Sequence, residues 1–333
     1  MIDVLRLTRE LIDIPSVTGE EFEIGNSLGE LLMRRGYQVE LQDIAPERSN
    51  IVARSGDRPR IVLSTHLDTV PPFIPSTEDD EFIYGRGACD AKGIIAAQIA
   101  AAEMLRAEGF KEIGLLFTSD EEVNSAGAKV ANQHPLALLC EYLINGEPTD
   151  NQLAVGTKGS LQATLSTEGR AAHSAYPEQG ESAIEKLLDV LHDVRGIDWP
   201  ADEVFGETTC NIGVISGGTR ANVIPSRAGA TIQIRLAVDA PSAKTLLENA
   251  IDGRAVLDYK SVHDPIRLTS LDGFEPMIAR FTTDIPYLSN WGKPLLIGPG
   301  SILDAHTDGE KVRKRELLAA VDLYVQIVKR LCG

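Results

Sequence analysis

Metal-competent side chains stand directly after apolar stretches at five separate places in this 333-residue chain. His66 and Asp90 come first, acidic sites follow at Glu121-Glu122 and at Glu147, and His306 comes late in the sequence. Ligands that converge from separate element ends are how a water-activating metal centre is usually built. The pattern therefore favours an α/β chain with a candidate hydrolase site at the ends of its strands.

Composition excludes several other classes of protein. The formal net charge is −17 and there is no basic block, so the surface repels phosphate backbones and nucleic-acid binding is not expected. No apolar run reaches the roughly 18–20 residues that cross a bilayer, and the first residues lack the apolar core of a signal peptide. Four cysteines without CxxC spacing are typical of reduced thiols. We expect a cytoplasmic protein with no membrane partner.

The first half of the chain alternates strand-like and helix-like segments. Alternation of this kind predicts a mainly parallel sheet with helices on both faces. The spacing from Thr18 to Glu21 predicts a capping box that starts the second helix. The expected strands are 37–41, 51–53, 61–63, 114–117 and 142–144, and the expected helices are 4–14, 21–33, 94–105 and 126–132.

The pattern changes near Gly159. Residues 159–265 follow a strand–helix–strand–strand–helix–strand order, which predicts an inserted α+β sandwich. After that segment the sequence predicts a helix over 276–282, a strand over 295–297 and a closing helix over 309–331. We therefore expect a catalytic domain of residues 1–158 plus 266–333, with 159–265 as an insertion.

His66 and Asp90 are the first two candidate metal ligands. Asp68 stands two residues after His66, on the same side of an extended chain, where its carboxylate can fix the tautomer of a ligand imidazole. Asp90 lies just before a helix, so the simpler interpretation of it is an N-cap. A carboxylate can also bridge two cations, and the nearby Gly85 and Gly87 indicate a close approach of the backbone.

The remaining candidates are three acids and an imidazole. Glu121 and Glu122 can face different ways, so that one binds metal while the other takes a proton from metal-activated water. Glu147 and His306 complete the set. Two imidazoles and three carboxylates suit a pair of Zn²⁺ ions, with Co²⁺ or Mn²⁺ as alternatives.

This constellation resembles the co-catalytic zinc family that contains aminoacylase, acetylornithine deacetylase, succinyl-diaminopimelate desuccinylase and carboxypeptidase G. The motifs that carry the resemblance are HLDTVPP, GRGACDAKG, SDEE, NGEP and AHTDGE. The resemblance implies that His66 and Glu147 hold one metal, that Glu122 and His306 hold the other, and that Asp90 bridges. It also implies that Glu121 is the general base and that Asp68 orients His66.

Three further matches lie in the expected insertion. His173 resembles a lid histidine that reaches the neighbouring subunit's site and stabilises an oxyanion. Asn222 resembles an asparagine that also acts in trans, and Arg235 matches an arginine that can hold a substrate carboxylate. For Arg235 an ordinary ion pair on the strand surface is an equal alternative. The resemblance thus implies a lid and a homodimer joined through residues 159–265.

The expected function is cleavage of the amide bond of a small N-acyl amino acid, in the manner of acetylornithine deacetylase. A dipeptidase or carboxypeptidase with the same chemistry is the first alternative, and a non-catalytic binding protein on the same fold is the second. Two departures from the family pattern, at 72–82 and at 123–125, touch no expected ligand but bear on the substrate pocket.

Overall fold

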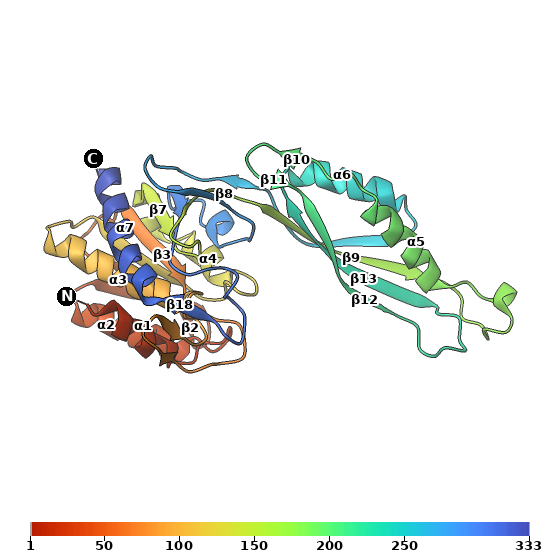
Figure 1. Cartoon of the computed structure of the whole chain (residues 1–333), viewed down its shortest axis with the longest axis horizontal. Helices are drawn as coiled ribbons and strands as arrows, with labels where there is room; N and C mark the ends of the chain where they lie inside the picture. Colours follow the sequence, from red (N-terminus) through yellow and green to blue (C-terminus); the bar gives the residue numbers. More distant parts are fainter. Residues whose placement is uncertain (1, 333) are drawn as a thin grey trace. The chain divides into compact units, whose positions relative to one another are not determined.

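The computed structural model describes residues 2–332 and has a mixed α/β fold. It divides into two compact units, which Figure 1 traces in the colours of the sequence. Unit 1 comprises the chain up to Val155, Leu268–Met277 and the chain from Thr283 onward. Unit 2 comprises Gly156–Arg267 and Ile278–Thr282.

A six-stranded sheet forms the centre of unit 1. Its strands β6, β3, β7 and β17 run parallel, while β2 joins β6 antiparallel and forms a hairpin with β1. Parallel strands end at the same edge, so the residues that follow β3, β6 and β7 gather there. In sheet order the strands are β1 (Gln38–Ala45), β2 (Arg48–Arg54), β6 (Ile113–Thr118), β3 (Ile61–His66), β7 (Tyr142–Asn145) and β17 (Lys293–Leu296).

Helices cover both faces of this sheet. Successive strand residues point to opposite faces, and residues on both faces are apolar, so each face needs a covering layer. On β3, Ile61 and Leu63 pack in the core shared with helices α1, α2, α3 and α7, whereas Val62 between them packs in the core shared with α4. The bounds are α1 (Val4–Ile12), α2 (Phe22–Arg34), α3 (Lys92–Ala107), α4 (Ala126–Ala131), α7 (Lys314–Cys332) and the 3-10 turns η1 (Pro135–Leu139) and η3 (Ile285–Tyr287).

Three local predictions are wrong. The helix expected over 276–282 is instead strand β16 (Pro276–Ala279), which neighbours β8 (Leu153–Thr157) in a three-stranded sheet with β15 (Ile266–Arg267). The closing helix begins at Lys314, because residues 311–313 form β18 and pair with β5 (Phe82–Tyr84), the neighbour of β4 (Thr77–Glu78).

The third wrong prediction is the capping box at the start of α2. The Thr18 hydroxyl donates to Asp68 at 2.8 Å instead of accepting from the helix, and the Glu21 carboxylate accepts two hydrogen bonds from Arg48. Both Thr18 and Glu21 therefore bond to residues distant in sequence instead of capping the helix. One of those partners, Asp68, belongs to the candidate site.

Unit 2 is an antiparallel sheet with two helices on one face. The sheet order is β12 (Thr209–Gly217), β13 (Arg227–Leu236), β9 (Gly159–Glu168) and β14 (Val256–His263). Figure 1 shows α5 (Ala183–Arg195) and α6 (Ala240–Ile251) along this sheet, and buried residues such as Leu161 and Ile234 pack against them. The short elements are η2 (Pro177–Gln179), β10 (Ala201–Asp202) and β11 (Gly206–Glu207).

Within residues 2–332, no helix combines the length and the apolarity needed to cross a bilayer.

Candidate metal centre

His66 is the last residue of β3 and is almost fully buried. Its Nδ1 lies 2.9 Å from the backbone carbonyl of Asp68, which accepts only if Nδ1 carries a proton, and this leaves Nε2 to face Asp90. Burial opposes protonation of the ring, but the Asp68 and Asp90 carboxylates outweigh it and raise the pKa of His66 well above its usual value. Because Nδ1 is engaged by the Asp68 carbonyl, Nε2 is the ring nitrogen that would be available to a cation beside Asp90.

Asp90 stands between two imidazoles. Its Oδ1 lies 2.9 Å from Nε2 of His66, and its Oδ2 lies 3.3 Å from Nε2 of His306. Burial would raise the pKa of Asp90, but the hydrogen bonds with His306 and His66 outweigh that effect and lower it. Each oxygen of this carboxylate thus faces a different candidate ligand.

His306 also meets Glu122, whose Oε1 lies 3.0 Å from the same Nε2. The hydrogen bonds with Asp90 and Glu122 raise the pKa of His306 to about 10. Ligand atoms of His66, Asp90 and Glu122 all lie within 4.8 Å of one another, which makes these three residues a candidate metal-binding group.

Glu121 and Glu147 add two more carboxylates to the same region. Among residues 2–332, neither side chain has a hydrogen bond or an ion pair. Burial, followed by the charge of Glu147, raises the pKa of Glu121 well above the usual value. Burial also raises the pKa of Glu147, and the charges of Asp90 and Glu122 act in the same direction.

This donor set fits divalent cations. Carboxylate oxygens and imidazole nitrogens are the ligands that Zn²⁺, Co²⁺ and Mn²⁺ take in proteins. Buried carboxylates without a positive partner are costly, and the two unpaired glutamates add to the negative charge around Asp90. Bound cations would compensate that charge.

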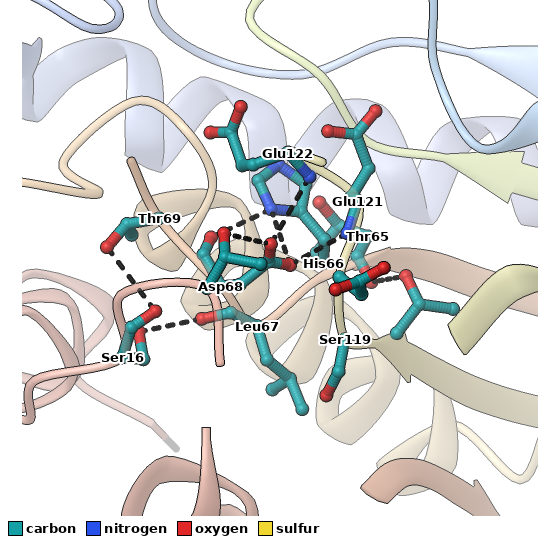
Figure 2. A network of polar contacts seen from close by, with 12 residues as sticks. Ser16, Thr65, His66, Leu67, Asp68, Thr69, Ser119, Glu121 and Glu122 are labelled. Atoms are coloured by element: carbon teal, nitrogen blue, oxygen red, sulfur yellow. Dashed lines mark hydrogen bonds and ion pairs between the residues drawn. The ribbon is translucent and has the colours of Figure 1, made fainter. Parts of the chain in front are cut away.

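Asp68 holds the segment that carries the two glutamates. Its Oδ1 accepts a hydrogen bond from the backbone nitrogen of Glu121 at 3.1 Å, and its Oδ2 accepts from that of Glu122 at 3.2 Å. Figure 2 shows these bonds, with the two glutamate side chains extending away from the Asp68 carboxylate. The carboxylate also lies 3.6 Å from Nδ1 of His66. Asp68 therefore holds the backbone of the glutamate segment and also contacts the His66 imidazole.

Asp284 is a site residue that the sequence analysis missed. It precedes η3, is buried, and accepts a hydrogen bond from Thr118, the last residue of β6, at 2.7 Å. Within the described chain its Oδ1 has no hydrogen-bond partner. Burial raises the pKa of Asp284 to about 6. No motif marks Asp284 in the sequence, because it follows no apolar strand and comes two residues after the helix expected over 276–282.

His173 and Asn222 lie together in unit 2, on the segments joined by a backbone bridge between His173 and Val223. The backbone nitrogen of Ser174 donates to the carbonyl of Asn222 at 3.1 Å. Nδ1 of His173 accepts from the backbone nitrogen of Ala175 at 3.1 Å, which places the ring proton on Nε2 in the neutral form. Both side chains are exposed.

Arg235 lies on β13, between two residues that pack against the helices of unit 2. Alternation along the strand places its side chain on the opposite, helix-free face. Burial lowers the pKa of the guanidinium. Among residues 2–332 no ion pair or side-chain hydrogen bond engages Arg235 on β13, and both the carboxylate anchor and the surface ion pair stay predictions for this side chain.

Taken together, the sheet edge and its acids and imidazoles define an α/β protein with a candidate divalent-metal centre at the strand ends. Residues 62–330 match the sequence pattern described as Peptidase family M20/M25/M40. The chain belongs to this peptidase family. The expected family resemblance is thereby confirmed at the level of the family, and with it the expectation of a peptidase-family hydrolase.

Curated relatives agree along nearly the whole chain. A peptidase M20 domain-containing protein of Schizosaccharomyces pombe is 36% identical, over 98% of this chain and 84% of the relative. A probable carboxypeptidase of Aspergillus niger is 37% identical, over 98% of this chain and 89% of the relative. Since the second is named a carboxypeptidase, the expected acetylornithine deacetylase-like branch stays a prediction.

Solved structures share the fold. A tripeptidase from Staphylococcus aureus superposes with a TM-score of 0.83 at 22% identity, covering 98% of each chain. A Bacillus subtilis protein described as a dinuclear metal-binding peptidase of the M20 family superposes with a TM-score of 0.71 at 15% identity, again over 98% of each chain. At such identities the likeness concerns the fold alone.

Proposed function

We propose that this protein hydrolyses the amide bond of a small substrate that keeps a free carboxylate, with a pair of divalent cations held at the candidate centre. The observation that carries the proposal is the position of Asp90, whose two oxygens face the Nε2 atoms of two different histidines. A carboxylate placed in this way can bridge two ions. The proposed ligands are His66, Asp90, Glu122, Glu147 and His306, and Zn²⁺ is the proposed metal.

When bound, such cations would lower the pKa of water towards about 7 and polarise the scissile carbonyl. Glu121 is the proposed general base. Its carboxylate has no hydrogen-bond or ion-pair partner in the described chain, and its raised pKa suits a group that takes up a proton. Glu121 takes the proton from the attacking water and later gives it to the leaving nitrogen. Asp68 keeps Glu121 in place through the backbone bond described above.

His173 is proposed to stabilise the oxyanion. Its Nδ1 is engaged by Ala175, so the free Nε2–H is available as a donor. Asn222 lies on the adjoining segment and is the proposed second polar contact. We propose that both act on the neighbouring subunit's site in a homodimer formed through unit 2, which would then serve as the lid and dimerisation domain, with boundaries near residues 159 and 265.

Arg235 is the proposed anchor for the substrate carboxylate. A partly buried guanidinium without an ion pair carries a desolvation cost that an incoming carboxylate would offset. Bidentate pairing with a carboxylate would also fix the orientation of the substrate. This favours substrates with a free carboxylate next to the scissile amide.

Two substrate classes share that feature. An N-acyl amino acid would be deacylated, as in acetylornithine deacetylase-like enzymes. A dipeptide or a short peptide would be cleaved by dipeptidase or carboxypeptidase action, and the carboxypeptidase names of relatives at 34–37% identity favour this second class.

The test is a substrate panel. Zinc- or cobalt-loaded protein is incubated with N-acetyl amino acids, N-succinyl amino acids and dipeptides, each with a free carboxylate and each matched by its carboxamide. Release of free amine from the acids and not from the carboxamides is expected, and the class that reacts decides between deacylase and peptidase. Equal cleavage of the carboxamides would contradict the anchoring role, and no cleavage in any class would contradict the proposed function.

A further inference from the structure

Arg86 and Glu310 form an ion pair inside unit 1, next to the candidate metal centre. Nη1 of Arg86 lies 2.6 Å from Oε2 of Glu310, and each residue is only 1% exposed. A buried pair of this kind is weak evidence for stability, because the desolvation of two charges cancels much of their attraction. We therefore look for a role of this pair other than stabilising the fold.

The glutamate end of the pair holds the loop that leads to Asp90. Oε1 of Glu310 accepts hydrogen bonds from the backbone nitrogens of Gly87 at 3.0 Å, Cys89 at 3.3 Å and Asp90 at 3.2 Å. The carboxylate therefore fixes the backbone of Asp90 itself. No other side chain among residues 2–332 accepts a hydrogen bond from the Asp90 backbone nitrogen.

The arginine end of the pair reaches the loop that carries His306. Nη1 of Arg86 donates to the carbonyl of Thr307 at 3.1 Å, and Nε donates to the carbonyl of Pro72 at 3.3 Å. Glu310 lies on the same loop as His306, four residues further on. The pair therefore joins the segment before Asp90 to the segment after His306, next to the backbone hydrogen bond from Gly85 to the Glu310 carbonyl.

The other ligand segments have different supports. His66 ends β3, and Glu147 follows β7 two residues after that strand ends, so both rest on the central sheet. His306 lies on a loop, with a backbone φ of 64° and a half-exposed side chain. Asp90 is shared by both proposed ions, but only the ion between Glu122 and His306 depends on both segments that the pair joins.

We propose that the buried Arg86–Glu310 pair is a positioning clamp that sets the distance between Asp90 and His306, and so controls the affinity of the second divalent ion. This inference rests on the proposed function, because it uses the proposed ligand roles. Neither residue touches substrate or metal. Loss of such a supporting contact typically weakens metal binding about 10- to 100-fold.

The experiment is a titration of the metal-free full chain with Co²⁺, followed by calorimetry and by the visible absorption of the bound ion. Glu310→Gln keeps the shape of the side chain but turns one acceptor into a donor. Arg86→Lys keeps the charge but loses the fork that reaches Thr307 and Pro72. In both variants we expect the first equivalent to bind within about threefold of the wild type and the second to bind about 10- to 100-fold more weakly.

Leu105→Ala is the control for a general loss of stability, because Leu105 is fully buried near the far end of α3. It should lower the melting temperature and leave both binding steps unchanged. Unchanged binding of the second ion in a folded Glu310→Gln or Arg86→Lys protein would overturn the clamp. So would an equal weakening of both steps in all three variants. If the wild type itself binds fewer than two ions, the proposed function fails instead.

Discussion

The carboxylate of Asp68 accepts a hydrogen bond from the backbone nitrogen of Glu121, with 3.1 Å between Oδ1 and that nitrogen. The sequence placed Asp68 beside His66 and indicated only that it would orient the imidazole. In the structure the residue has a second task, because the same carboxylate holds the segment on which the proposed base and the proposed ligand Glu122 lie.

Asp68→Asn should lower kcat strongly while the protein still folds. The amide can accept one of the two backbone bonds, but its NH₂ group would face the other N–H, which costs about 1–3 kcal/mol of stability for an unsatisfied buried donor. We expect kcat to fall about 10- to 100-fold as the glutamate segment loosens. The matched control is Thr18→Val, which removes only the hydroxyl bond to Asp68. A variant Asp68→Asn with wild-type kcat would contradict this role.

Glu121→Gln should separate metal binding from chemistry. Since Glu121 is proposed as base and not as ligand, the variant should keep both ions while the rate falls about 100- to 10,000-fold, the range that general acid–base catalysis supplies. Metal content by atomic absorption and kcat are measured on the same sample. Glu122→Gln is the comparison and should lose metal. Full activity of metal-loaded Glu121→Gln would remove Glu121 from its role.

Metal removal should destabilise the fold. The candidate centre gathers buried carboxylates whose charge the cations would compensate, so bound ions favour the native state. At a free Zn²⁺ concentration 100-fold above Kd, the expected gain is about 2.7 kcal/mol for one site. Melting temperatures with chelator and with Zn²⁺ measure this difference. Coincident melting curves would mean that the centre holds no ion.

Asp284→Asn should change how the stability of the metal-free protein depends on pH. The pKa of Asp284 is raised from 3.8 to about 6, so its ionisation costs folding free energy as the pH rises through that interval, and the full cost remains above it. Asparagine keeps an acceptor for Thr118 and removes the charge. The variant should match the wild type near pH 4 and unfold at higher denaturant concentration at pH 7. If Asp284→Asn were less stable than the wild type at pH 7, the charge of Asp284 would stabilise the fold, contrary to this prediction.

The proposed action of His173 in trans predicts complementation. His173→Ala and Glu121→Gln homodimers should each be inactive, whereas exchanged heterodimers contain one site with an intact base and an intact partner histidine. Mixed subunits should recover up to about a quarter of wild-type activity, since half of the dimers are mixed and each has one complete site. If exchanged heterodimers recover no hydrolytic activity, His173 does not contribute to the neighbouring subunit's site.

Local patterns in the sequence indicated most of the candidate ligands, because His66, Glu122 and Glu147 follow apolar strands and Asp90 precedes a helix. His306 lies on a loop and was indicated only by the AHTDGE motif. His66, Glu121 and Glu147 could be placed at one sheet edge from the order of strands alone, since parallel strands end on the same side. Apolar alternation likewise indicated helices on both faces, and the mixed α/β fold is confirmed. These predictions rest on local patterns that the tertiary structure does not override.

The errors and omissions share a physical cause, which is pairing over long sequence distances. Thr18 was assigned to a helix cap, but its hydroxyl is taken by Asp68, fifty residues away. Residues 276–279 form a strand instead of a helix, next to β8. Asp284 and the Arg86–Glu310 pair stand out only once the fold brings their partners together. No spacing rule connects residues 224 positions apart.

The central claim is that two cations share the carboxylate of Asp90. The most direct measurement is an anomalous difference map at the zinc absorption edge, from crystals of the protein grown with Zn²⁺. Two peaks about 3.5–4 Å apart, one on the His66 side of Asp90 and one on the His306 side, are the predicted result. A single peak, or zinc bound away from Asp90, would contradict the account.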